Sequence, residues 1–232
     1  MSTIVKILLT ICISIFLTSC HMDINFGEGE RGNGNVVTET RNVDENFTSV
    51  IASEGLDVYV SQDDNESIKV EADDNIIGLI RTDIKNGVLK VHTEKRIGRA
   101  KSKKVYISLS DITSLKSNSG ADLYGASILK GDRITLKSSS GADLKVEVEA
   151  NEVDCSASSG ADLIVSGSAN VLYADASSGS DIKAGRLVVE KCIAEATSGA
   201  DVRVNATKEV SIKSNSGGDV HYSGEPATVK KH

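Results

Sequence analysis

A five-residue motif recurs six times in the second half of the 232-residue chain and constrains the fold more than any other feature. Each copy reads Ser-Gly, one small residue, Asp and one aliphatic residue. The copies are Ser119-Gly120-Ala121-Asp122-Leu123, Ser140-Gly141-Ala142-Asp143-Leu144, Ser159-Gly160-Ala161-Asp162-Leu163, Ser178-Gly179-Ser180-Asp181-Ile182, Ser198-Gly199-Ala200-Asp201-Val202 and Ser216-Gly217-Gly218-Asp219-Val220. Their glycines are 21, 19, 19, 20 and 18 residues apart, a period typical of stacked coils. The motif therefore predicts a solenoid with one copy in each coil.

Hydrophobicity within each coil alternates with a period of two, which indicates strands. With the glycine as position zero, position +3 is aliphatic in every coil, positions −7 and −5 are mostly apolar, and positions −3 and −1 hold only Ser or Ala. We expect positions +3 and −7 to lie in the core; they are Leu123, Leu144, Leu163, Ile182, Val202 and Val220, and Thr113, Ile134, Val153, Leu172, Cys192 and Val210. Each coil is thus predicted to be two strand segments that meet at a narrow corner.

This pattern predicts an all-β, single-stranded parallel β-helix of about 19–20 residues per coil. A leucine-rich or helical repeat of similar length would need a leucine ladder with asparagine or an apolar stripe at helical spacing, and neither is present. We place the repeat β-helix at residues 111–232. A β-rich cap with the first coils is expected at residues 36–110, because an open coil exposes an unpaired edge.

Two features support this assignment of the cap. Gly55-Leu56-Asp57-Val58 preserves the Gly-x-Asp-aliphatic spacing and predicts an early, degenerate coil. Asn86-Gly87 separates two apolar runs, 79–84 and 88–91, and Asn-Gly suits the two-residue turn of a β-hairpin.

The aspartates of the motif would form a column with a spacing of about 4.8 Å between coils. Like charges at that spacing repel by about 1 kcal/mol or less per neighbour even at the dielectric of water. In a structural interpretation, each carboxylate accepts hydrogen bonds from backbone N–H groups at its corner. In the alternative, the column binds calcium, because Gly-x-Asp-aliphatic also occurs in the nonapeptide calcium repeat. That repeat has a nine-residue period, so we favour the structural role and assign no metal site. The column is Asp122, Asp143, Asp162, Asp181, Asp201 and Asp219.

Residues 1–19 are predicted to be a lipoprotein signal peptide. Lys6 precedes an apolar run, Ile7 to Leu17, that is too short to span a bilayer. Leu17-Thr18-Ser19-Cys20 resembles the bacterial lipobox, which implies cleavage before Cys20 and leaves this cysteine as a lipidated N-terminus, with palmitate among the expected lipids. His21 follows the cysteine where an aspartate would favour the inner membrane, so we expect a lipid anchor in the outer membrane, at the cell surface or the periplasmic face. The glycine-rich residues 20–35 are interpreted as the lipidated cysteine and a flexible tether.

Cleavage would remove one positive charge, leaving 26 − 1 = 25 Lys and Arg against 33 Asp and Glu, a net charge of −8. An acidic surface has no general attraction to nucleic acid, so we expect no nucleic-acid partner. One basic cluster interrupts it and comprises Lys95, Arg96, Arg99, Lys101, Lys103 and Lys104. It is either a solvated loop that keeps a sheet edge from pairing or an anion site for an acidic glycan or a lipopolysaccharide phosphate.

Cys155 and Cys192 occupy inward positions in coils two steps apart. That places them roughly 9–10 Å apart, beyond the reach of a disulfide, so the register predicts two buried free thiols. His21, His92, His221 and His232 are scattered without a nucleophile motif, and the repeated serines are small packing residues. A repeated array is typical of a scaffold, so we assign no catalytic residue. A polysaccharide-acting β-helix enzyme is the less favoured alternative.

The segment Gly55 to Gln62, the stretches 68–77 and 85–91, and the Ser-Gly-Ala-Asp corners together resemble the "putative auto-transporter adhesin, head GIN domain" family, common among lipoproteins of Bacteroidetes, over about residues 47–223. The resemblance implies a β-helical, extracytoplasmic domain with a role in adhesion and no established catalytic residues. The first hypothesis is thus a membrane-anchored adhesin or binding module that contacts carbohydrate or a surface protein through the polar faces of its coils. Outward residues at position −2 would contribute, namely Asn118, Ser139, Ser158, Ser177, Thr197 and Asn215. The alternative is a passive structural lipoprotein of the envelope.

Overall fold

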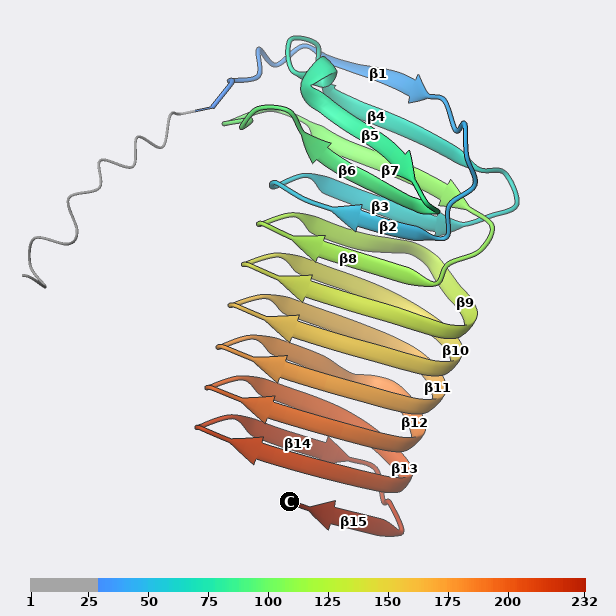
Figure 1. Ribbon diagram of the computed structural model, residues 1–232, viewed down its shortest axis with the longest axis vertical. Helices are drawn as coiled ribbons and strands as arrows, with labels where there is room; N and C mark the ends of the chain where they lie inside the picture. The colour runs from blue at the N-terminus through green and yellow to red at the C-terminus, as the bar shows by residue number, and fades with distance from the viewer. Residues whose placement is uncertain (1–28) are drawn as a thin grey trace, which may run out of the picture.

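The Ser-Gly corners form because two successive residues adopt left-handed backbone angles. In the first corner Ser119 has φ 53° and Gly120 has φ 71°, and all six corners repeat this pair. The Gly120 N–H then donates to the Ser140 carbonyl of the next coil at 3.1 Å, and the same bond links Gly141 to Ser159. The corners therefore stack in a column along one edge of the molecule (Figure 1).

The computed structural model describes residues 29–232 and contains a parallel β-solenoid of about six turns, as the repeat predicted. Five long strands each run from one corner, around a second bend, to the next corner: β9 (Asp122–Ser139), β10 (Asp143–Ser158), β11 (Asp162–Ser177), β12 (Asp181–Thr197) and β13 (Asp201–Asn215). Each pairs in parallel with its neighbours, with motif aspartate opposite motif aspartate. Strand β8 (Ser114–Asn118) leads into the first corner, and β14 (Asp219–Ser223) and β15 (Thr228–Lys231) form the last coil.

The flattened coils give the solenoid two sheets. We call the sheet that leads into the corners the front sheet; it holds β8 and the second halves of β9–β13, nearer the viewer in Figure 1. The rear sheet begins after each corner and holds the first halves of β9–β13 and β14. Side chains at odd offsets from the glycine fill the space between the sheets.

The core positions agree with the predicted register, except that Val220 in the last coil is only half-buried and Thr113 is exposed. Leu144, Leu163 and Ile182 are buried directly above one another, and so are Ile134 and Val153 at position −7. Thr113, also expected in the core, is exposed instead, and its backbone and hydroxyl bond Thr48. The coil begins from a loop rather than from a preceding long strand, so the neighbouring Ile112 is buried in its place.

Small residues are needed beside the corner because the two sheets converge there. Ser117 and Ser138 are buried, and their hydroxyls donate to the carbonyls of Ala121 at 2.6 Å and Ala142 at 2.7 Å. These bonds satisfy polar groups that would otherwise be buried without a partner. Alanine replaces serine at this position in the next three coils, where Ala157, Ala176 and Ala196 are buried.

The N-terminal region caps the solenoid and contains the early coil that Gly-x-Asp predicted. Strands β2 (Ser49–Ala52) and β3 (Asp57–Gln62) meet at a left-handed Glu54-Gly55 corner and pair in parallel with β8 and β9. Strands β6 (Val88–Thr93) and β7 (Lys103–Leu109) form a further coil on top of these, paired in parallel with β2 and β3. The coil that is earlier in the sequence thus lies deeper in the stack.

Antiparallel strands complete the cap (Figure 1). The predicted hairpin is confirmed: β5 (Ile80–Lys85) pairs with β6 across Asn86 and Gly87, whose φ angles are 53° and 75°. Strand β4 (Ser67–Asp73) pairs with β7, and β1 (Val36–Arg41) pairs with β4. A 3-10 turn, Ile77–Leu79, precedes β5.

No helix in the described residues 29–232 is long and apolar enough to cross a membrane.

Residues 30–35, expected to belong to a flexible tether, are bound to the cap instead. The Glu30 N–H donates to the Arg96 carbonyl at 2.8 Å, and the Glu30 carbonyl accepts from the Gly98 N–H at 2.9 Å. The Gly32 N–H donates to the Arg99 carbonyl at 3.0 Å. Buried Asp73 accepts from the Gly34 N–H at 2.7 Å. Glycine suits this segment because a Cβ at residue 32 would lie 2.2 Å from an Asp73 carboxylate oxygen, so its composition reflects close packing. Cys20 and the signal peptide lie outside the described residues.

Candidate functional site

The aspartates form a straight column on the rear sheet, directly after the corners. Consecutive members are register partners from Asp122 to Asp219. Asp57 of the cap pairs with Asp122 and adds a seventh member to the six found in the repeat. The outward residues at position −2 lie on the other side of the corner, on the front sheet, so the two sets flank the corner column.

The corners use their hydrogen bonds differently from the structural interpretation made from the sequence. The Gly120 N–H donates to Ser140, the Ala121 N–H donates to the Asn118 carbonyl, and the Asp122 N–H donates to the Leu56 carbonyl. Backbone carbonyls therefore take the N–H groups that the carboxylates were expected to bind. The aspartate side chains are left on the outer surface.

Lysines lie beside this column and reduce its repulsion. The Lys183 ammonium lies 3.0 Å from Asp162 and 3.2 Å from Asp181, and these bonds raise the pKa of Lys183. Lys104 pairs with Asp57 across β7 and β3, which places a positive charge at the end of the column. Partial burial and the charges of Asp143 and Asp57 raise the pKa of Asp122, while Lys103 opposes this shift.

Within residues 29–232, no group of three or more His, Cys, Asp or Glu side chains is placed to hold a metal ion.

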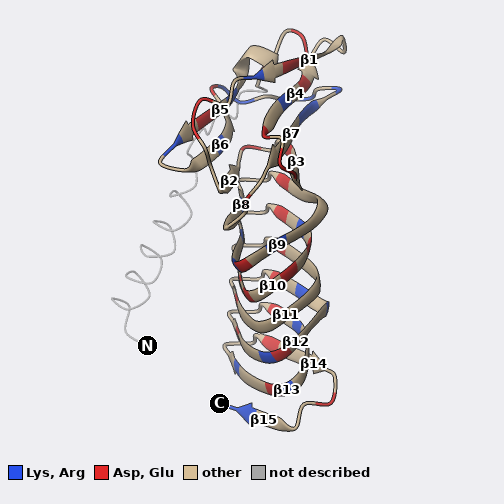
Figure 2. Ribbon diagram, turned by 90° about the vertical axis from the view of Figure 1, so that its right-hand side faces the viewer, with Lys and Arg blue, Asp and Glu red and all other residues tan. Residues whose placement is uncertain are grey.

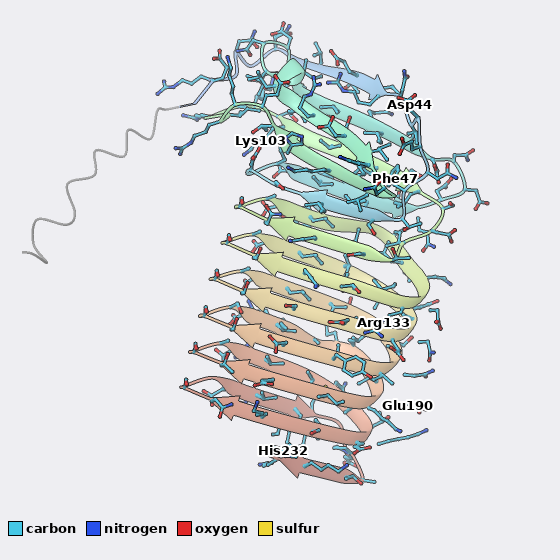
Figure 3. All side chains as sticks on the ribbon, viewed as in Figure 1. Asp44, Phe47, Lys103, Arg133, Glu190 and His232 are labelled. Carbon is cyan, nitrogen blue, oxygen red and sulfur yellow. The ribbon has the colours of Figure 1, made fainter. Side chains whose placement is uncertain are left out.

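Ion pairs between neighbouring coils cover both outer faces, and acidic and basic segments are interspersed along the stack in Figure 2. Lys130 pairs with Glu149 and Lys213 with Glu195, both across adjacent coils. On the front sheet Arg133 bonds Glu152 and Asp154 and lies 5.9 Å from the centre of the Tyr173 ring; Figure 3 shows Arg133 towards the second bend.

The basic cluster forms the corner of the β6–β7 coil. The loop 94–102 replaces the two-residue Ser-Gly turn and extends beyond the adjacent corner of the β2–β3 coil in Figure 1. Lys95, Arg96 and Lys103 line a cavity of about 490 Å³ under this loop, with Lys103 at the corner edge in Figure 3.

The other basic residues lie apart from that cavity. Arg99 and Lys101 line a second cavity of about 480 Å³ with Asp73, and Lys104 lies on the rear sheet opposite Asp57. The structure thus divides the six residues among three places.

The cysteine prediction is confirmed. Cys155 and Cys192 are buried free thiols in coils two steps apart. Burial raises the pKa of the Cys192 thiol to about 12, and burial followed by the charge of Asp154 raises the pKa of Cys155 further. Both act as small apolar residues in the core.

A stack of three tyrosines on the rear sheet was missed by the sequence reasoning. Tyr59 lies between Tyr106 and Tyr124, with ring centres 5.2 Å and 5.3 Å apart. Tyr59 and Tyr124 are four residues after their glycines, so aligning the early coil with the repeat would have brought this pair together. Tyr106 follows the basic loop instead of a Gly-x-Asp corner, and the sequence carries no signal that places it on the stack.

Comparison with solved structures gives the same fold. A crystal structure of a putative adhesin from Bacteroides fragilis has a TM-score of 0.81 at 18% identity and covers 87% of this chain and 94% of its own. A putative adhesin from Parabacteroides merdae gives 0.69 at 19% identity, with 87% and 95% covered. A putative lipid binding protein from Parabacteroides distasonis gives 0.65 at 17% identity, with 87% and 96% covered.

Comparison with curated proteins gives no match. A family model described as "Putative auto-transporter adhesin, head GIN domain" matches residues 46–226, which include the early coil, the hairpin and all six Ser-Gly corners. The chain therefore belongs to the family described as "Putative auto-transporter adhesin, head GIN domain".

Proposed function

We propose that the protein is a lipid-anchored envelope adhesin that binds an extracytoplasmic ligand through the polar outer faces of its solenoid. The observation that carries this proposal is the difference between inward and outward side chains. Inward side chains are small or aliphatic in every coil, while the outer faces repeat charged and hydroxyl groups at fixed spacing. Such a ladder suits an extended ligand, because each coil presents its motif aspartate about 4.8 Å from that of the previous coil. Family membership supports the adhesive role.

The anchor is tested at Cys20, which lies outside the described residues. Changing Cys20→Ala should abolish incorporation of labelled palmitate. Protease added to whole cells should degrade the wild-type domain if it lies at the cell surface and spare it at the periplasmic face. Incorporation of labelled palmitate into Cys20→Ala would contradict lipid attachment at Cys20.

Ligand binding is tested with the full-length protein in a sugar-free detergent, applied to an array of glycans and to immobilised surface proteins. Retention on a defined group of glycans or on one protein is expected. If nothing is retained, the protein is instead the passive structural lipoprotein of the envelope that the sequence left as the alternative. A polysaccharide-acting enzyme would require turnover that disappears when a single column aspartate is changed.

The cavity under the basic loop is proposed as a second contact, for carboxylate or phosphate groups of an acidic ligand. Three cationic side chains, Lys95, Arg96 and Lys103, and two carboxylates, Glu54 and Glu94, line it, so its formal charge is 3 − 2 = +1. Changing Lys95 and Arg96 to Ser should weaken retention on immobilised polygalacturonate or lipopolysaccharide. The matched control changes Arg99 and Lys101, which line the other cavity. Competition by inorganic phosphate but not by galacturonate would identify phosphate as the bound group, and equal retention by both double variants would refute the site.

A further inference from the structure

Two β-bulges interrupt the rear sheet on either side of β10 and β11. Between Lys145 and Glu147 of β10 there is one residue, whereas the paired segment of β9, Tyr124 to Ile128, has three. Between Ile164 and Ser166 of β11 there is one residue, whereas the paired segment of β12, Lys183 to Arg186, has two. These extra residues account for the two longest glycine spacings, 21 and 20. Bulges re-aim side chains and often lie beside binding sites.

A groove of about 320 Å³ lies between the two bulges. Its lining includes Tyr59, Tyr124, Lys145, Glu147, Ile164 and Arg186. The register explains this set: Tyr124, Lys145 and Ile164 follow one another along one column of the rear sheet, and Glu147 and Arg186 belong to the next column. The volume is near the lower end of the range for ligand pockets, about 300–1,000 Å³.

The aromatic stack ends at this groove. Tyr59 covers one side of the Tyr124 ring at 5.3 Å, and the next residue in the column is Lys145, not a fourth aromatic residue. Tyr124 therefore contributes apolar surface to the groove that no other ring covers, and the half-buried Ile164 extends it one coil further. Burial, followed by the charge of Asp122, raises the pKa of Tyr124, so its hydroxyl remains a neutral hydrogen-bond donor at physiological pH.

The charged groups of the groove have unused hydrogen-bonding capacity. The side chains of Lys145, Glu147 and Arg186 form no hydrogen bond or ion pair with any described residue, and all three residues are exposed. Elsewhere on the solenoid, lysines reach across to acidic partners, as Lys130 does to Glu149 and Lys208 to Glu190. The groove thus offers both donors and an acceptor next to an apolar wall.

We propose that this groove binds a neutral hexopyranose unit of a glycan, an inference that rests on the adhesive function proposed above. One face of a pyranose ring is lined by C–H groups and can lie against Tyr124 and Ile164, as other apolar surfaces pack on aromatic rings. Its hydroxyls need donors and acceptors together, which Lys145, Arg186 and Glu147 supply. The column of Asp122, Asp143 and Asp162 runs beside the groove, and its negative charge opposes an acidic sugar.

The test is calorimetric titration of the full-length protein, in a sugar-free detergent, with maltotetraose, cellotetraose, mannotetraose and tetragalacturonate. At least one neutral tetrasaccharide should bind. The variants Tyr124→Ala and Arg186→Ala should each weaken that binding at least tenfold, and Tyr124→Phe should retain most of it. Two controls leave the groove intact. Tyr106→Ala removes the tyrosine at the far end of the aromatic stack, and Arg203→Ala removes a cation that lies in the column of Tyr124 but outside the groove. Thermal melting confirms that each variant is folded.

Three results would overturn the groove site: no neutral tetrasaccharide binds, only tetragalacturonate binds, or both groove variants bind as wild type does. These outcomes differ from a failure of the adhesive function. If the array identifies a ligand whose retention is unaffected by Tyr124→Ala and Arg186→Ala, the protein is an adhesin that uses another surface. If the array and the titrations are both empty, both proposals fail.

Discussion

The ammonium of Lys183 donates a hydrogen bond to the carboxylate of Asp162 in the preceding coil, at 3.0 Å. It also lies 3.2 Å from Asp181, so a single lysine joins two neighbouring members of the aspartate column. The column is tolerated because such contacts and partial exposure to water reduce the repulsion between its charges.

Changing Lys183→Met should lower the free energy of unfolding by about 1 kcal/mol or less, the range for partly exposed ion pairs. The variant leaves Asp162 and Asp181 facing one another without a cation, so its deficit should shrink as salt screens their repulsion. Urea denaturation at low and high salt measures both effects. Lys145→Met is the control, because Lys145 has no ion-pair partner among the described residues and should show neither. A Lys183→Met deficit that grows with salt would contradict this account.

Gly167 should be the least replaceable glycine of the long strands. Its φ is 112°, and a Cβ there would lie 2.0 Å from the Val148 carbonyl oxygen of the adjacent coil. Gly167→Ala should cost about 2 kcal/mol or more, since it adds a backbone clash to an unfavourable φ. Gly141→Ala is the matched control. Gly141 has φ 66° but open space around an added Cβ, so only the unfavourable φ should reduce the free energy of unfolding, by about 1–2 kcal/mol. Chemical denaturation compares them, and equal losses would show that the clash is relieved.

The two core thiols should be inert in the folded protein. Because burial raises the pKa of Cys192 to about 12 and raises that of Cys155 as well, the thiolate that reacts with disulfide reagents is scarce at pH 8. We expect Ellman's reagent to label neither residue in the native mature protein, whose Cys20 thiol is predicted to carry lipid, and to label both after addition of guanidinium. An intramolecular disulfide detected by mass spectrometry would contradict the structure.

Asp73 should make the cap sensitive to acid. Burial tends to raise its pKa, but N–H groups of Ser102, Gly34 and Lys101 bond the carboxylate, and the net effect is a pKa below the usual 3.8. Its folded-state pKa is depressed, so its contribution to stability is present above about pH 4 and is lost as the pH falls through the folded-state pKa. Melting temperatures measured between pH 2 and 7 should show this decline.

The variant Asp73→Asn should melt at a lower temperature at pH 7, because an amide has a single acceptor oxygen for the bonds that two carboxylate oxygens now accept. The loss should vanish at the acid end, where Asp73 is itself protonated. Asp111→Asn changes an exposed carboxylate and serves as the control. A pH profile of Asp73→Asn parallel to that of the wild type would exclude this role.

The repeat in the sequence was sufficient to predict the solenoid, its register, the buried cysteines and the early coil at Gly55. These features depend on local rules that every coil repeats: a left-handed Ser-Gly pair, alternation of two, and small residues beside the corner. Thr113 shows where such reasoning ends, because the first coil begins from a loop and its core position is filled by Ile112. Residues 30–35 were misjudged for a related reason, since glycine content alone cannot distinguish a tether from a segment packed against Asp73.

The sequence by itself determined that the chain stacks coils and which side chains lie inside them, because neighbours in a coil are close in sequence. Tertiary structure alone decided how the cap is threaded, with the β2–β3 coil lying between the later β6–β7 coil and the repeats. That threading brings Tyr106 next to Tyr59 and Tyr124 and makes a basic loop the corner of one coil. The groove beside Tyr124 lies between the bulges in β9 and β12 and is lined by residues from coils up to four steps apart, from Tyr59 to Arg186. Such long-range neighbours are set by packing between coils.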